Sequence, residues 1–532
     1  MRRADKPGLL VKTNAAAEAP SLFTTAVNRM GYGETSGQKS EWNQLGGNEP
    51  ERFLGYVQQQ LNPSTIDDSV YEGQRSGAGF TTLDKGLSEL WVDHHRSGVG
   101  WSERSRPIRE VELDTFLRAI YSKRQLQEVM VEFWMNHFSM YGWDYWSVHV
   151  WSDVVNIVRT DCFRNFHTLL RKITKHPSML YYLDNYASTL AGPNENHARE
   201  LVELHTLGAE NYYGVGDPSA VPVEPHPDGT NWPIAYVDND VYEATRALTG
   251  WSVANGSSDR PNNGQFYYDD ADHDRFQKII LGLTMPANRK QEDGDDLLRR
   301  LADHPGTARH IARKLCRRFI SDDPPQNVVD AAAQRFFSRR NSSNQIRDTL
   351  QVILESPEFE ATWAQKVKRP FDVAVSALRA TKSNFNFTWN ADDVDDFLWN
   401  YDRCGQALFT WPAPDGFPDV RNKWQSTTPR VMTWRLMLWM ADERTSSGNY
   451  RWNVVSKTTG AGALTAEEVV DYWANRIFRR NLDPLDHDEL VDFMANGFSP
   501  TSPLPIGNDS DTDARVRSLV ALMCNMPTFL ER

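Results

Sequence analysis

Apolar side chains recur at helical spacing through most of this 532-residue chain, whereas the alternation of a half-buried strand is scarce. Only residues 265–268 read as a short strand with a neighbour to pair with. The main helical patterns are expected over residues 87–91, 110–120, 124–138, 147–159, 165–176, 179–185, 238–248, 305–320, 326–337, 344–355, 369–380, 429–441, 466–477, 486–494 and 514–523. The sequence therefore predicts a mainly α protein: a large multi-helical body with long irregular loops and few short strands.

Composition divides the chain into three parts. Residues 1–50 are rich in Ala, Gly, Ser, Asn and Thr with little periodicity, and we expect an extended N-terminal arm there. Residues 51–380 are expected to form the main helical domain, which carries the candidate site. Residues 381–532 are expected to form a C-terminal helical region that includes a proline- and aromatic-rich loop at 409–424.

Charge and cysteine content exclude several classes of protein. The formal net charge of -13 disfavours nucleic-acid binding, because the summed field repels phosphate. No apolar run of about 18 residues is present, so no membrane insertion is expected. The four cysteines lack CxxC spacing, which disfavours a disulfide scaffold or a zinc module. Near the N-terminus only residues 8–11 are apolar, so no signal peptide is visible and the chain is expected to be intracellular or to have lost a leader.

The segment 194–208 concentrates the candidate chemistry. Glu200 and Glu203 lie on adjacent turns of its predicted helix, beside Asn196, and Arg199 can orient both carboxylates. Two such carboxylates can act as acid and base or as ligands of a divalent cation, with Asn196 binding substrate. The simpler interpretation is an exposed ion-pair ladder worth about 0.3–0.5 kcal/mol per pair.

A histidine on an earlier helix is the expected partner of these carboxylates. His137 falls on the apolar stripe of the predicted helix 124–138, beside Trp134. One interpretation is a core histidine bonded to a carbonyl. The other is a general base or metal ligand that faces Glu200, with Trp134 lining the substrate site.

An acidic loop provides a second group of candidates. Asp270, Asp272 and Asp274 alternate as in a calcium loop, but the glycine and glutamate of an EF-hand are missing. A looser cation site and a solvated acidic loop both remain open. His273 and Asp274 are second-rank catalytic candidates. The candidate metal ligands of the chain are Glu200, His137, Asp272 and Asp274.

Aromatic residues are unusually frequent, with 18 Trp in the chain, and some of them could line a binding groove. The loop 411–424 combines stiffening prolines with Trp411 and Asp415, as a sugar-stacking platform would. A rigid structural lid would look the same. Trp251 is a further candidate for the aromatic wall of the site.

Several short motifs occur in an order and spacing that resemble one family. They are Phe133-Trp134-Met135-Asn136-His137-Phe138, Asn194-Glu195-Asn196 through His205-Thr206-Leu207-Gly208, Arg246 through Trp251, His273-Asp274, His304-Pro305 through Lys314-Leu315, Ser356-Pro357-Glu358-Phe359, Pro414-Asp415-Gly416 and Pro418-Asp419-Val420. Over roughly residues 25–530 the chain resembles the bacterial domain-of-unknown-function 1800 family. The resemblance implies no settled activity or cofactor. Members often look like exported proteins, which makes export possible here.

These features favour an enzyme acting on a polar polymer, with carbohydrate as the expected class and hydrolase or lyase chemistry as the expected reaction. The elbow, phosphate-loop, dinucleotide and zinc-helix motifs of familiar enzymes are missing. The alternative is a non-catalytic surface or assembly protein in which the same charges form a buried structural network. An open pocket beside Glu200 would favour the enzyme, and a closed cluster of paired charges would favour the scaffold.

Overall fold

The computed structural model describes residues 20–35, 37–95, 98–257, 259–383, 385, 387–444 and 451–532. Helices account for 56% of the chain and strands for 7%, which confirms the mainly α class with few short strands. None of the described helices is long and apolar enough to cross a membrane.

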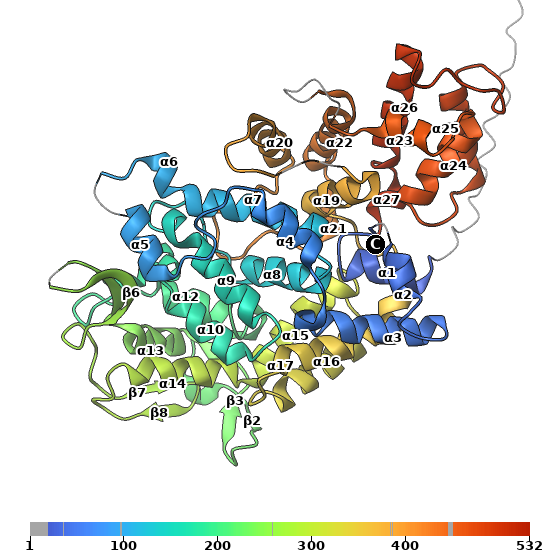
Figure 1. Cartoon of the computed structure of the whole chain (residues 1–532). Coiled ribbons are helices and arrows are strands. Elements are labelled where there is room, and N and C mark those ends of the chain that lie inside the picture. The colour runs from blue at the N-terminus through green and yellow to red at the C-terminus, as the bar shows by residue number, and fades with distance from the viewer. Residues whose placement is uncertain are drawn as a thin grey trace, which may run out of the picture.

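The first half of the chain folds into helices that cover the left and centre of Figure 1, except the first three, which lie at its right. They are α1 (Leu22–Arg29), α2 (Gln38–Trp42), α3 (Glu49–Gln60), α4 (Ser69–Ser76), α5 (Leu87–His95), α6 (Trp101–Arg104), α7 (Arg106–Tyr121), α8 (Gln125–His137), α9 (Trp151–Asp161), α10 (Phe166–Thr174), α11 (Pro177–Tyr182), α12 (Asn196–Glu203) and α13 (Asp238–Leu248). Among these, α8 packs on α9, and α12 packs on α13.

The second half begins with a helical layer below the first and ends in a separate group at the upper right of Figure 1. The lower layer is α14 (Glu292–Ala302), α15 (Pro305–Phe319), α16 (Gln326–Ser338), α17 (Gln345–Leu354) and α18 (Pro357–Ala361). The later helices are α19 (Pro370–Thr381), α20 (Asp392–Asp402), α21 (Arg421–Trp424), α22 (Thr427–Asp442), α23 (Val454–Gly460), α24 (Ala466–Ile477), α25 (Pro484–Ala495), α26 (Ser510–Met523) and α27 (Pro527–Leu530).

Eight strands form four two-stranded sheets within the described residues. They are β1 (Tyr212–Gly214), β2 (Val223–Pro225), β3 (Asn231–Pro233), β4 (Tyr236–Val237), β5 (Trp251–Asn255), β6 (Asn262–Tyr268), β7 (Lys278–Ile280) and β8 (Leu283–Met285). The predicted strand 265–268 lies inside β6, which pairs antiparallel with β5 so that Tyr268 faces Trp251. The β2–β3 hairpin projects from the bottom of the body (Figure 1).

Residues 22–42 are not the extended arm that composition suggested, because they contain α1 and α2. The Ser21 hydroxyl accepts a hydrogen bond from the Thr24 amide and caps α1. Phe23 and Trp42 are buried, with ring centroids 5.2 Å apart. Low helical periodicity concealed this segment, which is ordered by tertiary packing. Residues 1–19 of the expected arm lie outside the described residues.

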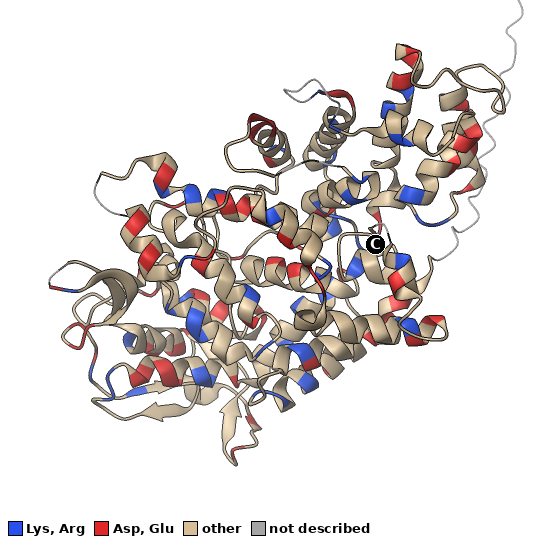
Figure 2. Cartoon of the chain, in the orientation of Figure 1, with Lys and Arg blue, Asp and Glu red and all other residues tan. Residues whose placement is uncertain are grey.

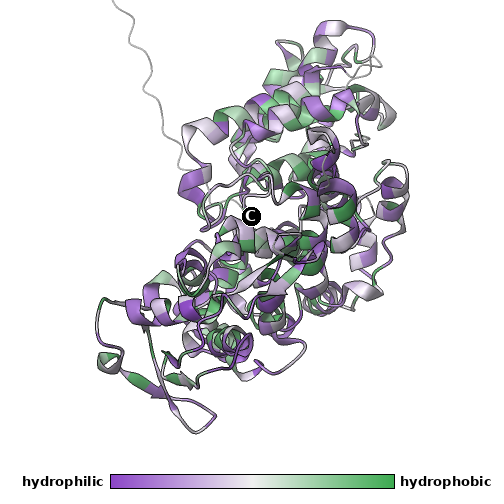
Figure 3. Cartoon of the chain, turned by 90° about the vertical axis from the view of Figure 1, so that its left-hand side faces the viewer, coloured by the Kyte–Doolittle hydropathy of each residue, from purple (hydrophilic) through white to green (hydrophobic). Residues whose placement is uncertain are grey.

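One hydrophobic cluster runs from Phe23 to Leu530 and joins the early helices to the last. In Figure 3 the hydrophobic residues lie mainly where helices face one another, and hydrophilic residues lie outside. Figure 2 shows acidic and basic residues interspersed over the same helices. The C-terminus lies beside α1, so segments from both ends of the chain meet (Figure 1).

Candidate functional site

The predicted helix 194–208 ends earlier than expected, at Glu203. The backbone amides of Leu204 and His205 both donate to the Glu200 carbonyl, at 2.9 and 3.0 Å, so the last turn widens. Gly208 then leaves the helix with φ +90°, where a Cβ would lie 2.4 Å from Nδ1 of His310. Close docking of α15 on this turn therefore fixes the end of α12.

The side chains of α12 divide into a paired ladder and one carboxylate outside it. Arg199 Nη2 lies 2.5 Å from Glu195 Oε1 and 3.4 Å from Asp238, and its Nη1 lies 3.9 Å from Glu203. The exposed-ladder interpretation therefore fits Arg199 and Glu203. Asn196, the expected substrate-binding group, is exposed on the first turn.

Glu200 is half-buried and has no ion-pair partner among the described residues. Burial and the neighbouring Glu203 carboxylate raise its pKa above the ordinary value, against the pull of Arg199. The Asp415 carboxylate also contributes to this rise in pKa. A raised pKa on a half-exposed carboxyl is typical of a group that can donate a proton near neutral pH.

The proline-aromatic loop is held against the C-terminal end of α8. Asn136 donates through Nδ2 to the Phe417 carbonyl (2.9 Å) and accepts from the Phe417 amide (2.7 Å). At Gly416, with φ +76°, a Cβ would lie 2.2 Å from the Asn136 carbonyl oxygen. Trp411 Nε1 donates to Asp415 at 2.7 Å. Asp415 of this loop lies within electrostatic reach of Glu200 on α12.

Lys314 of α15 is a titratable residue of this site that sequence reasoning missed. Burial and the nearby Arg317 lower its pKa to about 8, against the attraction of Glu210, Asp419 and Asp415. The available signal was its position four residues after His310, where a lysine interrupts the arginines of the helix.

His137 is buried, with Nε2 3.1 Å from the His205 carbonyl oxygen. Burial and the charges of Lys314, His205 and His310 hold its pKa well below the ordinary value. The charges that shift the pKa of Glu200 are those of Glu203, Arg199 and Asp415, and His137 is not among them. The imidazole is thus a neutral core group bonded to a carbonyl, in agreement with the simpler of the two interpretations.

Two of the predicted substrate-binding aromatics lie in the core. Trp134 is fully buried and donates through Nε1 to the Cys162 carbonyl at 3.1 Å. Trp251 is also fully buried, packed so closely on Gly294 that a Cβ there would lie 2.1 Å from its ring. Neither ring can touch a ligand in this structure, because both are buried, and a high content of aromatic residues supplies a core as readily as a groove.

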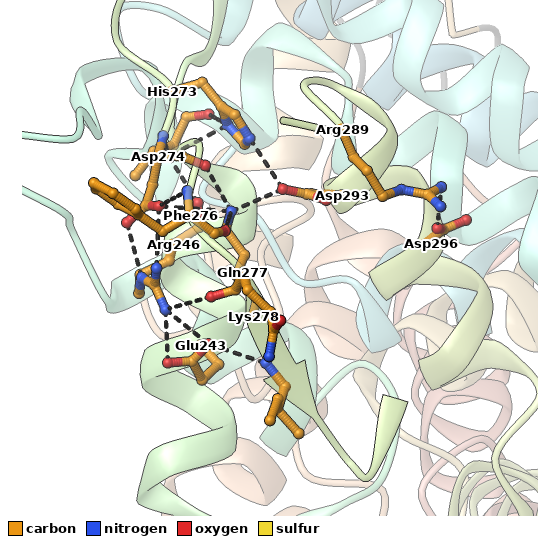
Figure 4. A network of polar contacts seen from close by, with 12 residues as sticks. Glu243, Arg246, His273, Asp274, Phe276, Gln277, Lys278, Arg289, Asp293 and Asp296 are labelled. Atoms are coloured by element: carbon orange, nitrogen blue, oxygen red, sulfur yellow. Dashed lines mark hydrogen bonds and ion pairs between the residues drawn. The ribbon is translucent and has the colours of Figure 1, made fainter. Parts of the chain in front are cut away.

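His273 and Asp274 belong to a closed polar network (Figure 4). His273 Nε2 lies 3.2 Å from Asp293, and Lys278 Nζ lies 2.8 Å from the same carboxylate. Arg246 binds both oxygens of Asp274, at 2.8 and 3.1 Å. Burial would raise the pKa of Asp293, but the hydrogen bonds from His273 and Lys278 hold it below its ordinary value. A closed cluster of paired charges is the arrangement expected for a non-catalytic surface or assembly protein.

The candidate metal ligands do not come together. Asp274 is occupied by Arg246, and Asp272 lies 3.5 Å from Arg260. His137 is enclosed in the core. Within the part of the chain that the structure describes, no group of three or more His, Cys, Asp or Glu side chains is arranged to hold a metal ion.

An aromatic groove lies beside the carboxylates of α12 and the loop. It has a volume of about 370 Å³ and is lined by Tyr141, Asp144, Trp146, Tyr181, Tyr182, Asp184, Tyr186 and Pro412. Trp146 stacks on Tyr181 at 4.8 Å, and Tyr181 lies 4.6 Å from Tyr186. Asp184 has the left-handed φ of +59°, which is uncommon outside glycine. Sequence reasoning missed this groove, although each of the segments 143–146 and 181–186 places one aspartate among aromatic residues.

Tyr182 connects the groove to the carboxylates. Its hydroxyl donates to the Pro412 carbonyl at 2.9 Å, which ties α11 to the loop. Burial and the charges of Glu200 and Asp415 raise the pKa of this hydroxyl to about 12. Tyr182 therefore lines the groove, contacts the loop and lies within electrostatic reach of Glu200.

The network in Figure 4 gives a first prediction. We expect Lys278→Met to lower the free energy of unfolding by about 3–5 kcal/mol, because Asp293 stays buried with its main cation removed. Urea denaturation measures this change. The matched control is Lys290→Met, an exposed lysine 3.8 Å from Asp270, expected to change stability by less than about 0.5 kcal/mol. Equal effects of the two variants would mean that the network does not stabilise the fold.

The fold and the site define a mainly helical protein with an acidic, aromatic-lined surface groove. The chain belongs to the family described as Protein of unknown function (DUF1800), whose model matches residues 25–531. No curated protein matches the chain. No solved structure matches it.

Proposed function

We propose that the chain is an enzyme that acts on a polar polymer, that this polymer is a glycan, and that Glu200 is its acid. The observation that carries the proposal is the position of Tyr182, which lines the aromatic groove and lies within electrostatic reach of Glu200 and Asp415. The Tyr182 side chain therefore connects the proposed binding surface with the proposed reactive carboxylates. Export, which the family resemblance suggests, would bring such an enzyme to polysaccharide outside the cell.

The lining of the groove suits a carbohydrate. Aromatic rings such as Trp146 and Tyr186 offer apolar faces for the C–H surface of a sugar ring and keep a polar edge in water. Asp144 and Asp184 add carboxylate oxygens that can accept hydrogen bonds from hydroxyl groups. A groove rather than a closed cavity leaves room for a chain that continues on both sides.

The chemistry assigned to the site is hydrolysis with two carboxyl groups. Glu200 enters the reaction protonated and gives its proton to the leaving glycosidic oxygen. Asp415 accepts a proton from the water whose oxygen attacks the anomeric carbon. Lys314 lies within electrostatic reach of Asp415 and adds positive charge on the α15 side of the site.

The direct test is Glu200→Gln, assayed for turnover on a panel of polysaccharides. We expect kcat to fall by about 10²–10⁴-fold, because the amide cannot donate the proton, while the melting temperature changes little. Glu195→Gln is the matched control, since Glu195 belongs to the same ladder with Arg199 but is not among the charges that shift the pKa of Glu200, and it should retain most activity. A wild-type protein that binds glycan without product, or a Glu200→Gln variant with full turnover, would reject the enzymatic proposal.

The groove is tested separately by Tyr186→Ala. Tyr186 lines the groove and is partly exposed, so we expect about a tenfold rise in KM with a small change in kcat, the size of one lost stacking contact. Tyr242→Ala on α13 is the control, because Tyr242 is also exposed but lies outside the groove. Equal KM values for both variants would place substrate binding elsewhere.

A second candidate is a non-catalytic surface or assembly protein. The closed network of Figure 4 favours it, because His273 and Asp274 serve structure there. In that case the groove would bind a glycan or partner without turnover. Binding that survives Glu200→Gln unchanged, together with a wild-type protein that yields no product, would support this second function.

A further inference from the structure

A different group of buried charges lies where α8, α15, α19 and the last residues of the chain meet. It contains six cationic side chains, Arg29, Arg318, Lys366, Lys368, Arg369 and Arg532, and four carboxylates, Glu132, Asp322, Asp372 and Asp419. The cations are in excess. Buried cations normally have a matched carboxylate each, because an uncompensated buried charge is costly.

Several members of the cluster are fully engaged. Arg369 Nη2 lies 2.6 Å from Glu132. Lys366 Nζ lies 2.8 Å from Asp322 and 3.2 Å from Asp419. Arg29 donates to uncharged oxygens, among them the carbonyl of Phe359. These contacts engage three of the four carboxylates and leave Asp372 as the main carboxylate for the remaining cations.

Arg318 and Arg532 are the members without adequate partners. Their side chains are 1% and 2% exposed, and none of their guanidinium nitrogens has a hydrogen-bond partner among the described residues. Arg318 Nη2 lies 3.6 Å from Asp372 Oδ1 and 3.5 Å from Glu132, and Arg532 Nη1 lies 3.3 Å from Asp372 Oδ2. The two guanidinium groups thus approach one carboxylate from its two oxygens.

Electrostatics agree with a surplus of positive charge at this place. Burial lowers the pKa of Arg532 to about 10, and the repulsion from Arg318 lowers it more than the attraction of Asp372 raises it. Burial lowers the pKa of Lys368 to about 7. Burial and the charge of Arg532 lower the pKa of Arg29 to about 9. One carboxylate is therefore too little for the cations around it.

We propose that a tetrahedral oxyanion, phosphate or sulfate, binds between the guanidinium groups of Arg318 and Arg532. Guanidinium groups present paired N–H donors in the geometry that such oxygens accept. An anion would satisfy the unpartnered donors and neutralise the surplus charge in one step. The pocket between α8 and the loop at 406–417 is lined by Tyr32, Glu132 and Phe371, so its wall touches the cluster and gives a small anion a route inward.

The test uses the full chain dialysed against Tris-chloride, with three proteins: wild type, Arg318→Met and Arg313→Met. Arg313 is the matched control because it lies on the same helix but contacts Gln326, at 3.3 Å, outside the cluster. Retained phosphate and sulfate are measured by ion chromatography after denaturation. The melting temperature is then followed during addition of sodium phosphate or sulfate, with sodium chloride at the same ionic strength as the reference.

We expect wild type and Arg313→Met either to retain about one oxyanion per chain or to gain melting temperature along a saturable curve. Arg318→Met should show neither. The unsaturable rise that sulfate gives every protein by exclusion from its surface is removed by comparison of the variants. A wild type that retains no oxyanion and responds to phosphate and sulfate as to chloride overturns the proposal. Both readouts are made on wild type, so this outcome holds even where Arg318→Met folds poorly.

Discussion

The free energy of unfolding is expected to fall steeply as the pH drops from 7.5 to 5, because five histidines are buried in neutral form. They are His137, His149, His197, His205 and His304. Burial lowers the pKa of His149 to about 2, lowers the pKa of His197, His205 and His304 to about 3, and holds the pKa of His137 well below its ordinary value.

The sign follows from linkage. In the unfolded chain each imidazole takes up a proton near pH 6.5, whereas in the folded protein it stays neutral down to a far lower pH. Their contribution to stability is therefore complete above pH 6.5 and is lost as the pH falls towards the folded pKa values. At pH 5 each histidine lowers the free energy of unfolding by about 2 kcal/mol, and the five together lower it by about 10 kcal/mol.

Two buried acids oppose this loss. Burial raises the pKa of Glu112 to about 7 and that of Asp402 to about 6, so both gain stability as they become protonated. Together the two acids raise the free energy of unfolding by about 4 kcal/mol at pH 5. Burial also lowers the pKa of the half-buried His95 and His167 to about 4, which adds to the loss. The expected net decrease is therefore at least about 6 kcal/mol, measured by urea denaturation at several pH values. Carboxylates with lowered pKa values act only below this window, so the histidines dominate it.

A single variant isolates one histidine. Neither ring nitrogen of His197 has a hydrogen-bond partner among the described residues, so His197→Leu removes a titrating group and no bond. We expect the pH-dependent decrease to shrink by about 2 kcal/mol. His487→Gln, at a partly exposed histidine beside Asp471, is the control variant measured in the same way. A wild-type stability that is flat from pH 7.5 to 5 would contradict the neutral burial of these rings.

Gly416→Ala is expected to lower the free energy of unfolding by about 3–4 kcal/mol. The left-handed φ costs a non-glycine residue about 1–2 kcal/mol. The new Cβ would also lie 2.2 Å from the Asn136 carbonyl oxygen, so the loop must lift away from α8. Lifting breaks the two hydrogen bonds between Asn136 and Phe417, each worth about 1 kcal/mol.

Gly405→Ala separates these contributions, because Gly405 has the similar φ of +87° but no atom within 4 Å of the added Cβ. It should show the conformational cost alone. If Asp415 takes part in the proposed reaction, Gly416→Ala should also lower turnover well below that of Gly405→Ala in native buffer. Equal stability losses for the two variants would mean that the loop does not depend on its contact with Asn136.

Periodicity was enough to predict the helical class, and the strand at 265–268 was found because apolar and polar residues alternate there. The early helices α1 and α2 were not predicted, since eight and five residues give too few turns for a periodic signal. Their order comes from long-range packing of Phe23 and Trp42, which a local pattern does not contain.

The candidate site was predictable only where chemistry and local sequence coincide. Glu200 and Asp415 lie in charged or turn-forming motifs, and the structure brings them within electrostatic reach of each other. Trp134 and His137 shared the same helix signal but point into the core, because a stripe of large side chains does not reveal which face is covered. The groove is built from separate segments, 141–146 and 181–186, whose proximity is a property of the fold.

The left-handed turn at Asp184 limits which amino acids can occupy a solvent-exposed position. Glycine and asparagine tolerate that backbone, whereas valine and isoleucine do not, whatever their polarity. In a saturation library at position 184, the stability of each variant should depend first on whether its residue tolerates this backbone. Loss of the carboxylate should be the second effect. The Asp184→Asn variant would isolate the effect of the charge, since asparagine tolerates the backbone and has the shape of aspartate but no charge.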